Sequence, residues 1–78
     1  MPTDNANRKA EQVSGVSNLT YDLNALLHNT LEAIAALEVY KADCQDDQEA
    51  SSLFDELQKR SIEDVQRIKP LLIKQLSR

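Results

Sequence analysis

The two stretches that decide the fold of this chain are LTYDLNALLHNTLEAIAALEVYKADC, residues 19–44, and LFDELQKRSIEDVQRIKPLLIKQL, residues 53–76. An apolar residue recurs every three or four positions along each stretch, which keeps apolar side chains on one side of an α-helix. The short acidic segment QDDQE, residues 45–49, follows the first stretch. The sequence therefore predicts an all-α protein, a long antiparallel two-helix hairpin.

The first helix is expected over residues 18–44, after a disordered N-terminal tail over residues 1–17. Apart from Met1, the tail has only Val13 and Val16 as sizeable apolar side chains, too few to offset the entropy of ordering it. Either Ser17 or Asn18 can cap the helix by accepting a hydrogen bond from an N–H group of the first turn.

The second helix is expected over residues 47–77. Two N-terminal caps are available, Asp47 alone or a capping box formed by Asp46 and Glu49. Pro70 cannot donate to the carbonyl of Gln66, so a kink or a break is expected near it.

Both helices have apolar faces wider than the seam of a two-stranded coiled coil. Leu27, Leu31 and Ile34 widen the face of the first helix, and Leu71 and Ile73 widen that of the second. A helix with such a face needs more than one neighbour. We therefore expect two hairpins to dimerise into a four-helix bundle. The residues assigned to core and dimer packing are Leu23, Leu26, Thr30, Ala33, Leu37, Tyr40, Phe54, Leu57, Ser61, Val65, Ile68 and Leu72. Leu19, Cys44, Leu53 and Leu76 continue the same spacing.

The length of the chain supports the same expectation. Its 78 residues make one domain. A core of this size supplies only about 3–5 kcal/mol of stability unless a disulfide, a bound metal or an oligomer interface adds to it. The single cysteine, Cys44, cannot form a disulfide within the chain, and with the single histidine, His28, it cannot complete a structural zinc site. Self-association is therefore the source of additional stability that remains.

Composition argues against several classes of partner. The net charge of −4 and the three aromatic residues do not match the basic, aromatic-rich surface of a nucleic-acid-binding protein. No run of about 18 apolar residues predicts a membrane span, and the N-terminal segment lacks the apolar core of a signal peptide. We expect a cytoplasmic protein that binds neither nucleic acid nor membrane.

The sequence also lacks the usual catalytic equipment. His28 is the only imidazole, and about four helical turns separate it from Cys44. A single glycine cannot build a glycine-rich phosphate loop. The chain is therefore predicted to be non-enzymatic and to carry no cofactor, while Cys44 is left open as a small apolar residue, an intersubunit disulfide or a reactive thiol.

Several features in order resemble a known family. An aromatic residue, Tyr40, is followed by Asp47-Gln48-Glu49 and then by Leu53-Phe54 and Leu57. This order resembles the helical hairpin of ferritin-like proteins of the rubrerythrin type. It is closest to small ferritin-like domains of unknown function, and the resemblance covers about residues 31–72.

The resemblance also implies where metal ligands would lie. Alignment on Tyr40 and Phe54 places Ala33 and Ser61 at two glutamate positions and Asp64 at the histidine position. Such a set implies a relative of the fold without metal.

Two alternative hypotheses remain beside the homodimer. One is a ferritin-like metal-binding or oxidoreductase protein with a carboxylate site at the dimer interface, built from Asp64 with Glu32 or Glu63 and with His28. The other is an adaptor that binds another protein through its tail or through the basic end, residues 67–78.

Overall fold

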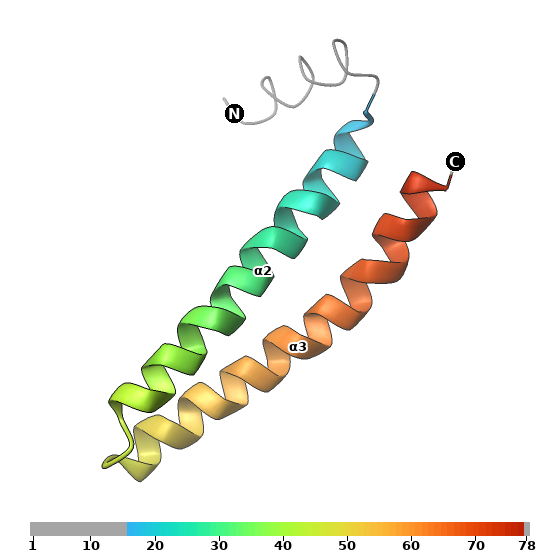
Figure 1. Ribbon diagram of the computed structural model, residues 1–78. Helices are drawn as coiled ribbons and strands as arrows, with labels where there is room; N and C mark the ends of the chain where they lie inside the picture. Colours follow the sequence, from blue (N-terminus) through green and yellow to red (C-terminus); the bar gives the residue numbers. More distant parts are fainter. Residues whose placement is uncertain (1–15, 78) are drawn as a thin grey trace.

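The computed structural model describes residues 16–77, which form two α-helices, α2 over Asn18–Asp43 and α3 over Gln48–Leu76. The helices pack against each other side by side and run in opposite directions, with the connecting turn at one end (Figure 1). The start of α2 consequently lies at the same end of the hairpin as the end of α3. The all-α hairpin predicted from the sequence is confirmed. The predicted tail lies outside the described residues, apart from Val16 and Ser17.

The N-terminus of α2 is capped by Ser17, whose hydroxyl accepts a hydrogen bond from the backbone N–H of Thr20 at 3.0 Å. Of the two caps considered, the structure therefore uses Ser17. The helix ends at Asp43, one residue before the expected end. Cys44 caps it there by donating its backbone N–H to the carbonyl of Lys41 at 3.3 Å.

The N-terminus of α3 is capped by Asp47, whose carboxylate accepts from the N–H of Ala50 at 3.0 Å. Asp46 does not cap the helix; it lies in the turn between the helices. Pro70 lies inside α3, and the helix continues beyond it to Leu76, so the break does not occur. The Pro70 ring is exposed, while the next residue of the buried side, Leu72, is still half-buried. We attribute the continuity of the helix to this packing, because burial can offset one missing hydrogen bond.

The buried side of each helix follows a seven-residue repeat. Every residue of the following two sets is buried or half-buried: Thr20, Leu23, Leu27, Thr30, Ile34, Leu37 and Lys41 in α2 with its C-cap Cys44, and Ser51, Phe54, Gln58, Ser61, Val65, Ile68, Leu72 and Gln75 in α3. Spacings of three and four alternate along both sets, as in the seam of a coiled coil. We call these two sets the seam.

The observed seam differs from the expected one at every second position along α2 and at three positions in α3. In α2 and its C-cap, the predicted Leu23, Thr30, Leu37 and Cys44 belong to it, but the residues that alternate with them are Thr20, Leu27, Ile34 and Lys41. Leu19, Leu26, Ala33 and Tyr40, expected at those places, are exposed. In α3, Ser51, Gln58 and Gln75 take the places expected for Leu53, Leu57 and Leu76. The reason is that α2 carries apolar residues in two adjacent rows with the same spacing. The position of α3 decides which of these rows is covered.

Candidate functional site

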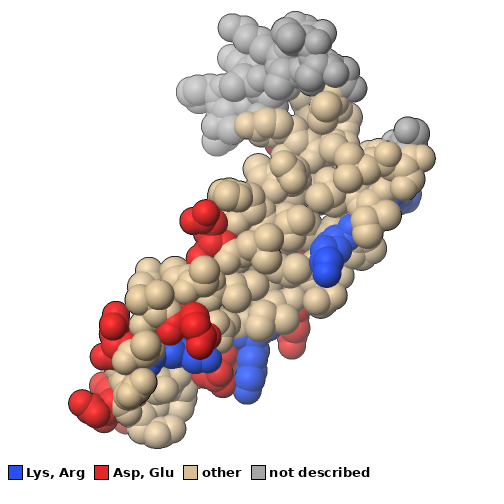
Figure 2. All heavy atoms as spheres, in the orientation of Figure 1, with Lys and Arg blue, Asp and Glu red and all other residues tan. Residues whose placement is uncertain are grey.

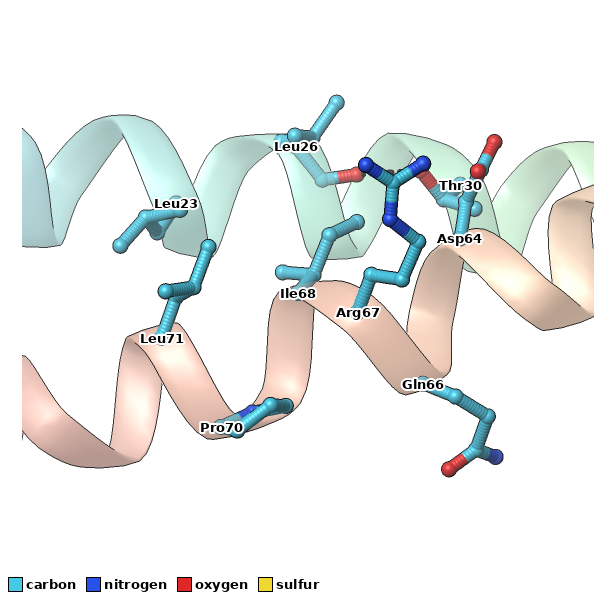
Figure 3. Close-up of a pocket in the computed structure, with 9 residues that line it drawn as sticks. All are labelled: Leu23, Leu26, Thr30, Asp64, Gln66, Arg67, Ile68, Pro70 and Leu71. Atoms are coloured by element: carbon cyan, nitrogen blue, oxygen red, sulfur yellow. Dashed lines mark hydrogen bonds between the residues drawn. The ribbon is translucent and has the colours of Figure 1, made fainter.

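A groove of about 690 Å³ opens between the helices on one side of the hairpin. Its lining includes Leu23, Leu26 and Thr30 of α2 and Asp64, Arg67, Ile68 and Leu71 of α3. Figure 3 shows Leu71 reaching from α3 toward Leu23, and Arg67 reaching toward α2, whereas Gln66 points away from α2. The groove therefore has apolar walls from both helices and a carboxylate and a guanidinium at its rim.

The groove belongs to a longer exposed surface. Residues seven apart lie two turns apart on nearly the same line of a helix, so the rows through Leu26 and Leu71 can be followed along both helices. We call these rows the groove face: Leu19, Leu26, Ala33 and Tyr40 in α2, and Leu57, Asp64 and Leu71 in α3. All seven residues are exposed, and Leu19, Leu26 and Leu71 each expose about half of their surface, at 51%, 50% and 53%.

An aromatic contact lies toward the turn. The rings of Tyr40 and Phe54 lie 5.6 Å apart at an interplanar angle of 53°. Such a tilted pair is a favourable aromatic geometry. Phe54 belongs to the seam and Tyr40 to the groove face, so the contact connects the two surfaces.

A group of polar side chains joins the helices in the half of the hairpin near the turn. We call it the polar cluster: Glu38, Lys41, Asp55, Gln58 and Lys59. The ammonium of Lys41 donates to the side-chain oxygen of Gln58 at 2.8 Å and lies 3.4 Å from the carboxylate of Asp55. Asp55 also pairs with Lys59 at 3.1 Å.

Gln58 is the centre of this cluster. Its amide nitrogen donates to the backbone carbonyl of Ile34 at 3.1 Å and to the carboxylate of Glu38 at 2.8 Å. The residue is only 8% exposed, and its polar atoms are hydrogen-bonded to α2. A buried amide that is satisfied in this way fixes the position of one helix along the other.

The cluster lowers the pKa values of two carboxyl groups. The amide of Gln58 and, next, the charge of Lys41 hold the pKa of Glu38 below its ordinary value. Hydrogen bonds from Lys59 and Lys41 do the same for the pKa of Asp55. In both cases the ionised form receives the hydrogen bonds, which is why the shift is downward.

The two exposed sides of the hairpin therefore differ in kind. The side opposite the groove face carries Glu38 and Asp55 of the cluster, and residues seven positions from them, Leu31 and Ile62, lie in the same rows. Its apolar residues are separated by charges, whereas the α2 row of the groove face contains no charged residue. The apolar rows and the groove make the groove face the better candidate for an interaction surface.

The titratable residues considered for catalysis or metal binding do not gather in one place. His28 and Glu32 form an i, i+4 pair at 3.4 Å with side chains 71% and 70% exposed. Asp64 lines the groove, whereas neither His28 nor Glu32 is part of the groove lining. Within residues 16–77, no three His, Cys, Asp or Glu side chains are placed to hold a metal ion. Cys44 is half-buried at the end of α2, and its thiol contacts the carbonyl of Lys41 at 3.6 Å.

His28 also borders a second, smaller hollow of about 330 Å³ on the surface of α2. The other lining residues are Tyr21, Asn24, Ala25 and Asn29. All five residues come from one helix, so the hollow is a surface depression rather than an interhelical site.

The twelve residues predicted to pack fall into three groups within one hairpin. Leu37, Val65 and Ile68 are buried; Leu23, Thr30, Phe54, Ser61 and Leu72 are half-buried; Leu26, Ala33, Tyr40 and Leu57 are exposed. All four exposed members lie on the groove face. Their packing against a second copy stays a prediction.

Sequence reasoning missed Gln58 and Lys41, two residues of the seam whose side chains hydrogen-bond to each other between the helices. A signal for Gln58 was present, because it lies four residues after Phe54 and three before Ser61, on the same three-and-four spacing. Its polar side chain made Leu57 the more attractive choice at that turn. Lys41 likewise follows Leu37 by four residues, beside Tyr40.

Comparisons with protein-family models, curated proteins and solved structures give no match for this chain. The ferritin-like resemblance therefore stays a prediction from the residues that carry it. Neither α2 nor α3 contains an apolar segment long enough to span a lipid bilayer.

Proposed function

We propose that this chain is a non-enzymatic cytoplasmic protein that acts through homodimerisation, in which two hairpins form a ferritin-like four-helix bundle. A bundle of this kind acts by binding, so we extend the proposal to a protein partner carried on its outer surface. The observation that supports dimerisation is the exposure of the groove face.

The hairpin buries little by itself. Among the described residues, only Leu37, Val65 and Ile68 are buried apolar residues. Leu19, Leu26 and Leu71 meanwhile stay half-exposed. Covering a half-exposed leucine is worth about 1 kcal/mol, so a partner that covers several of them adds a substantial fraction of the stability of a small domain.

Sedimentation equilibrium over a range of protein concentrations tests the proposal. The expected mass is about twice the chain mass of 8.8 kDa, with helicity and mass falling together on dilution. A folded, helical monomer at low micromolar concentration would contradict dimerisation.

A matched pair of variants identifies the surface involved. Leu26 and Leu31 are both in α2 and are 50% and 49% exposed, but Leu26 lies on the groove face and Leu31 on the opposite side, seven residues before Glu38. Leu26→Glu should weaken dimerisation about 100-fold or more, because it buries an unpaired charge in the interface. Leu31→Glu adds the same charge and should leave the dimer nearly unchanged. Equal effects of the two variants would contradict a role for the groove face.

A further inference from the structure

The groove face has an edge on each helix, formed by the next row round the helix on the side away from the seam. Leu23 precedes Leu26 by three residues and Asn29 follows it by three, so the two lie about 60° to either side of Leu26. Leu23 belongs to the seam, and Asn29 therefore lies beyond the groove face. We call the two rows the edges: Asp22, Asn29, Ala36 and Asp43 in α2, and Leu53, Arg60, Arg67 and Lys74 in α3.

The two edges differ in charge. The charged residues of the α2 edge are two acids, those of the α3 edge are three bases, and all five are exposed. The only lysine or arginine of α2 is Lys41, which belongs to the seam. Figure 2 shows basic side chains along the half of α3 toward the open end, and acidic side chains gathered over the turn end. The groove face is therefore bounded by an acidic edge on α2 and a basic edge on α3.

A two-fold axis can bring two groove faces together in two ways. An axis across the groove, perpendicular to the helices, puts the two turns at opposite ends. It sets α2 against α2 and α3 against α3, so each edge meets itself. An axis along the groove puts both turns at the same end and sets α2 of each copy against α3 of the other, so each edge meets the other edge.

The height of the edge residues along the hairpin decides which charges meet. Thr30 and Arg67 line the same groove, and Figure 3 shows Arg67 reaching toward α2 beside Thr30. Asn29 is consequently level with Arg67, and two turns nearer the open end Asp22 is level with Lys74. Rotation about an axis along the groove leaves heights unchanged. It therefore brings Arg67 of one copy to Asn29 of the other, and it brings Lys74 to Asp22.

The axis across the groove brings like charges together instead. It reverses heights about the middle of α3, so Arg60 of one copy comes opposite Arg67 of the other. The two copies of Asp64 come opposite each other, and the α2 edges bring Asp22 toward Asp43. Charges within about 8 Å of each other are incompletely screened at physiological ionic strength. The orientation with the turns at opposite ends is therefore disfavoured.

We propose that the second copy covers the groove face with its turn at the same end, so that the basic edge of each α3 lies along the acidic edge of the other copy's α2. This inference rests on the proposed homodimer and adds its orientation and its edge contacts.

The acidic turns become neighbours in this orientation, but most of their charges do not face the second copy. Glu38 and Asp55 lie on the side opposite the groove face. Glu49 and Glu56 are seven residues apart in a row on the side of α3 away from α2. The edge acid near the turn, Asp43, is level with the α3 edge at its uncharged end, so it meets no second carboxylate there.

The distance between two spin labels separates the orientations. The single cysteine, Cys44, lies at the turn end and carries a nitroxide label in the full-length chain. With both turns at one end, the two labels lie at diagonal corners of one layer of helices packed about 10 Å apart, and their separation should be roughly 15–25 Å. With the turns at opposite ends, each label lies about 20 Å along the axis from the middle of α2, and the separation should be roughly 35–45 Å.

Each outcome of the distance measurement has a distinct meaning. A dimer with the short distance supports the inference. A dimer with only the long distance overturns the inference and leaves the homodimer in place. A folded monomer overturns the homodimer, and the inference with it. If the label at half-buried Cys44 disturbs the fold, a Cys44→Ser, Gln45→Cys variant carries it at an exposed position one residue further along.

The sign of a new charge at Asn29 tests the edge contact itself. Asn29→Asp places a carboxylate opposite Arg67 of the other copy and should tighten dimerisation about 3- to 30-fold, since a two-fold dimer forms the pair twice. Asn29→Lys places two like charges together and should weaken dimerisation by a similar factor. Sedimentation equilibrium measures both dissociation constants.

The control is the same pair of substitutions at Asn24, which is exposed in the same helix. Asn24 lies seven residues before Leu31, on the side opposite the groove face. Asn24→Asp and Asn24→Lys should leave the dissociation constant nearly unchanged. Far-ultraviolet circular dichroism shows whether each variant keeps its helices, and the label distance does not depend on these variants.

Effects of the same sign from both charges at Asn29 contradict the inference. Asn29 lies near the middle of α2, so an axis across the groove would bring its two copies close together, and either charge would then weaken the dimer. No change from either charge would show that the edge of α2 does not meet the basic edge of α3.

Discussion

The two halves of the hairpin hold their helices together by different means. Near the turn, the buried amide of Gln58 and the ammonium of Lys41 connect α2 and α3 through directional hydrogen bonds. Toward the open end, Val65 and Ile68 are buried by apolar packing. Hydrogen bonds specify position along the helix, whereas apolar packing is non-directional and supplies most of the free energy. The comparison indicates that the turn half sets the register of the helices and the open half supplies stability.

The largest effect is expected in the apolar half. Ile68→Ala removes a side chain that is only 6% exposed and should lower the free energy of unfolding by about 2–4 kcal/mol, through lost transfer energy and a cavity. Ile73→Ala is the matched control, because Ile73 is in the same helix and 60% exposed; its effect should be below about 0.5 kcal/mol. Urea unfolding followed by circular dichroism measures both. Similar losses for the two variants would show that Ile68 is not a core residue.

An intermediate effect is expected in the polar half. Gln58→Ala removes the hydrogen bonds that the side-chain amide of Gln58 makes with Lys41 and with the carbonyl of Ile34, and it should cost about 1–3 kcal/mol of unfolding free energy. Gln75, which is half-buried in the same seam at the open end, provides the control. Gln75→Ala should cost less than Gln58→Ala in the same urea experiment. The reverse order would contradict a register-setting role for Gln58.

The smallest effect is expected from pH. The pKa values of Glu38 and Asp55 are lower in the folded chain than their ordinary values, so the ionised forms stabilise the fold. This contribution is complete above the unfolded-state pKa values, at about pH 5, and is lost as the pH falls through the lower folded-state values. Both carboxylates are exposed, so the change should be modest.

Thermal unfolding at pH 7 and at pH 3 checks the contribution of these two carboxylates. It compares the parent chain with a Glu38→Gln, Asp55→Asn double variant. The melting temperature of the parent should fall more on acidification than that of the variant. An identical fall in both would assign the acid sensitivity to other groups.

The expected fold came from signals that involve only near neighbours along the chain. Ser17 and Asp47 cap helices because their side chains reach N–H groups three residues ahead. The packing surface was predicted only in part. Leu26 and Leu27 both fit the apolar spacing of α2, and the sequence does not show which of the two faces α3. The polar cluster was missed because a glutamine and a lysine read as surface residues when their cross-helix partners are unknown.

The sequence by itself determined two long helices and their opposite directions, and it reduced each N-terminal cap to two candidates, since propensity, capping and a short turn act within a few residues. Only the tertiary structure decided which ladder is covered, that Gln58 is buried, and that Leu26 and Leu71 border one groove. Those outcomes depend on the rotation of one helix against the other, which contacts between distant residues fix. The exposed groove face, on which the proposed dimer rests, is the direct consequence of that rotation.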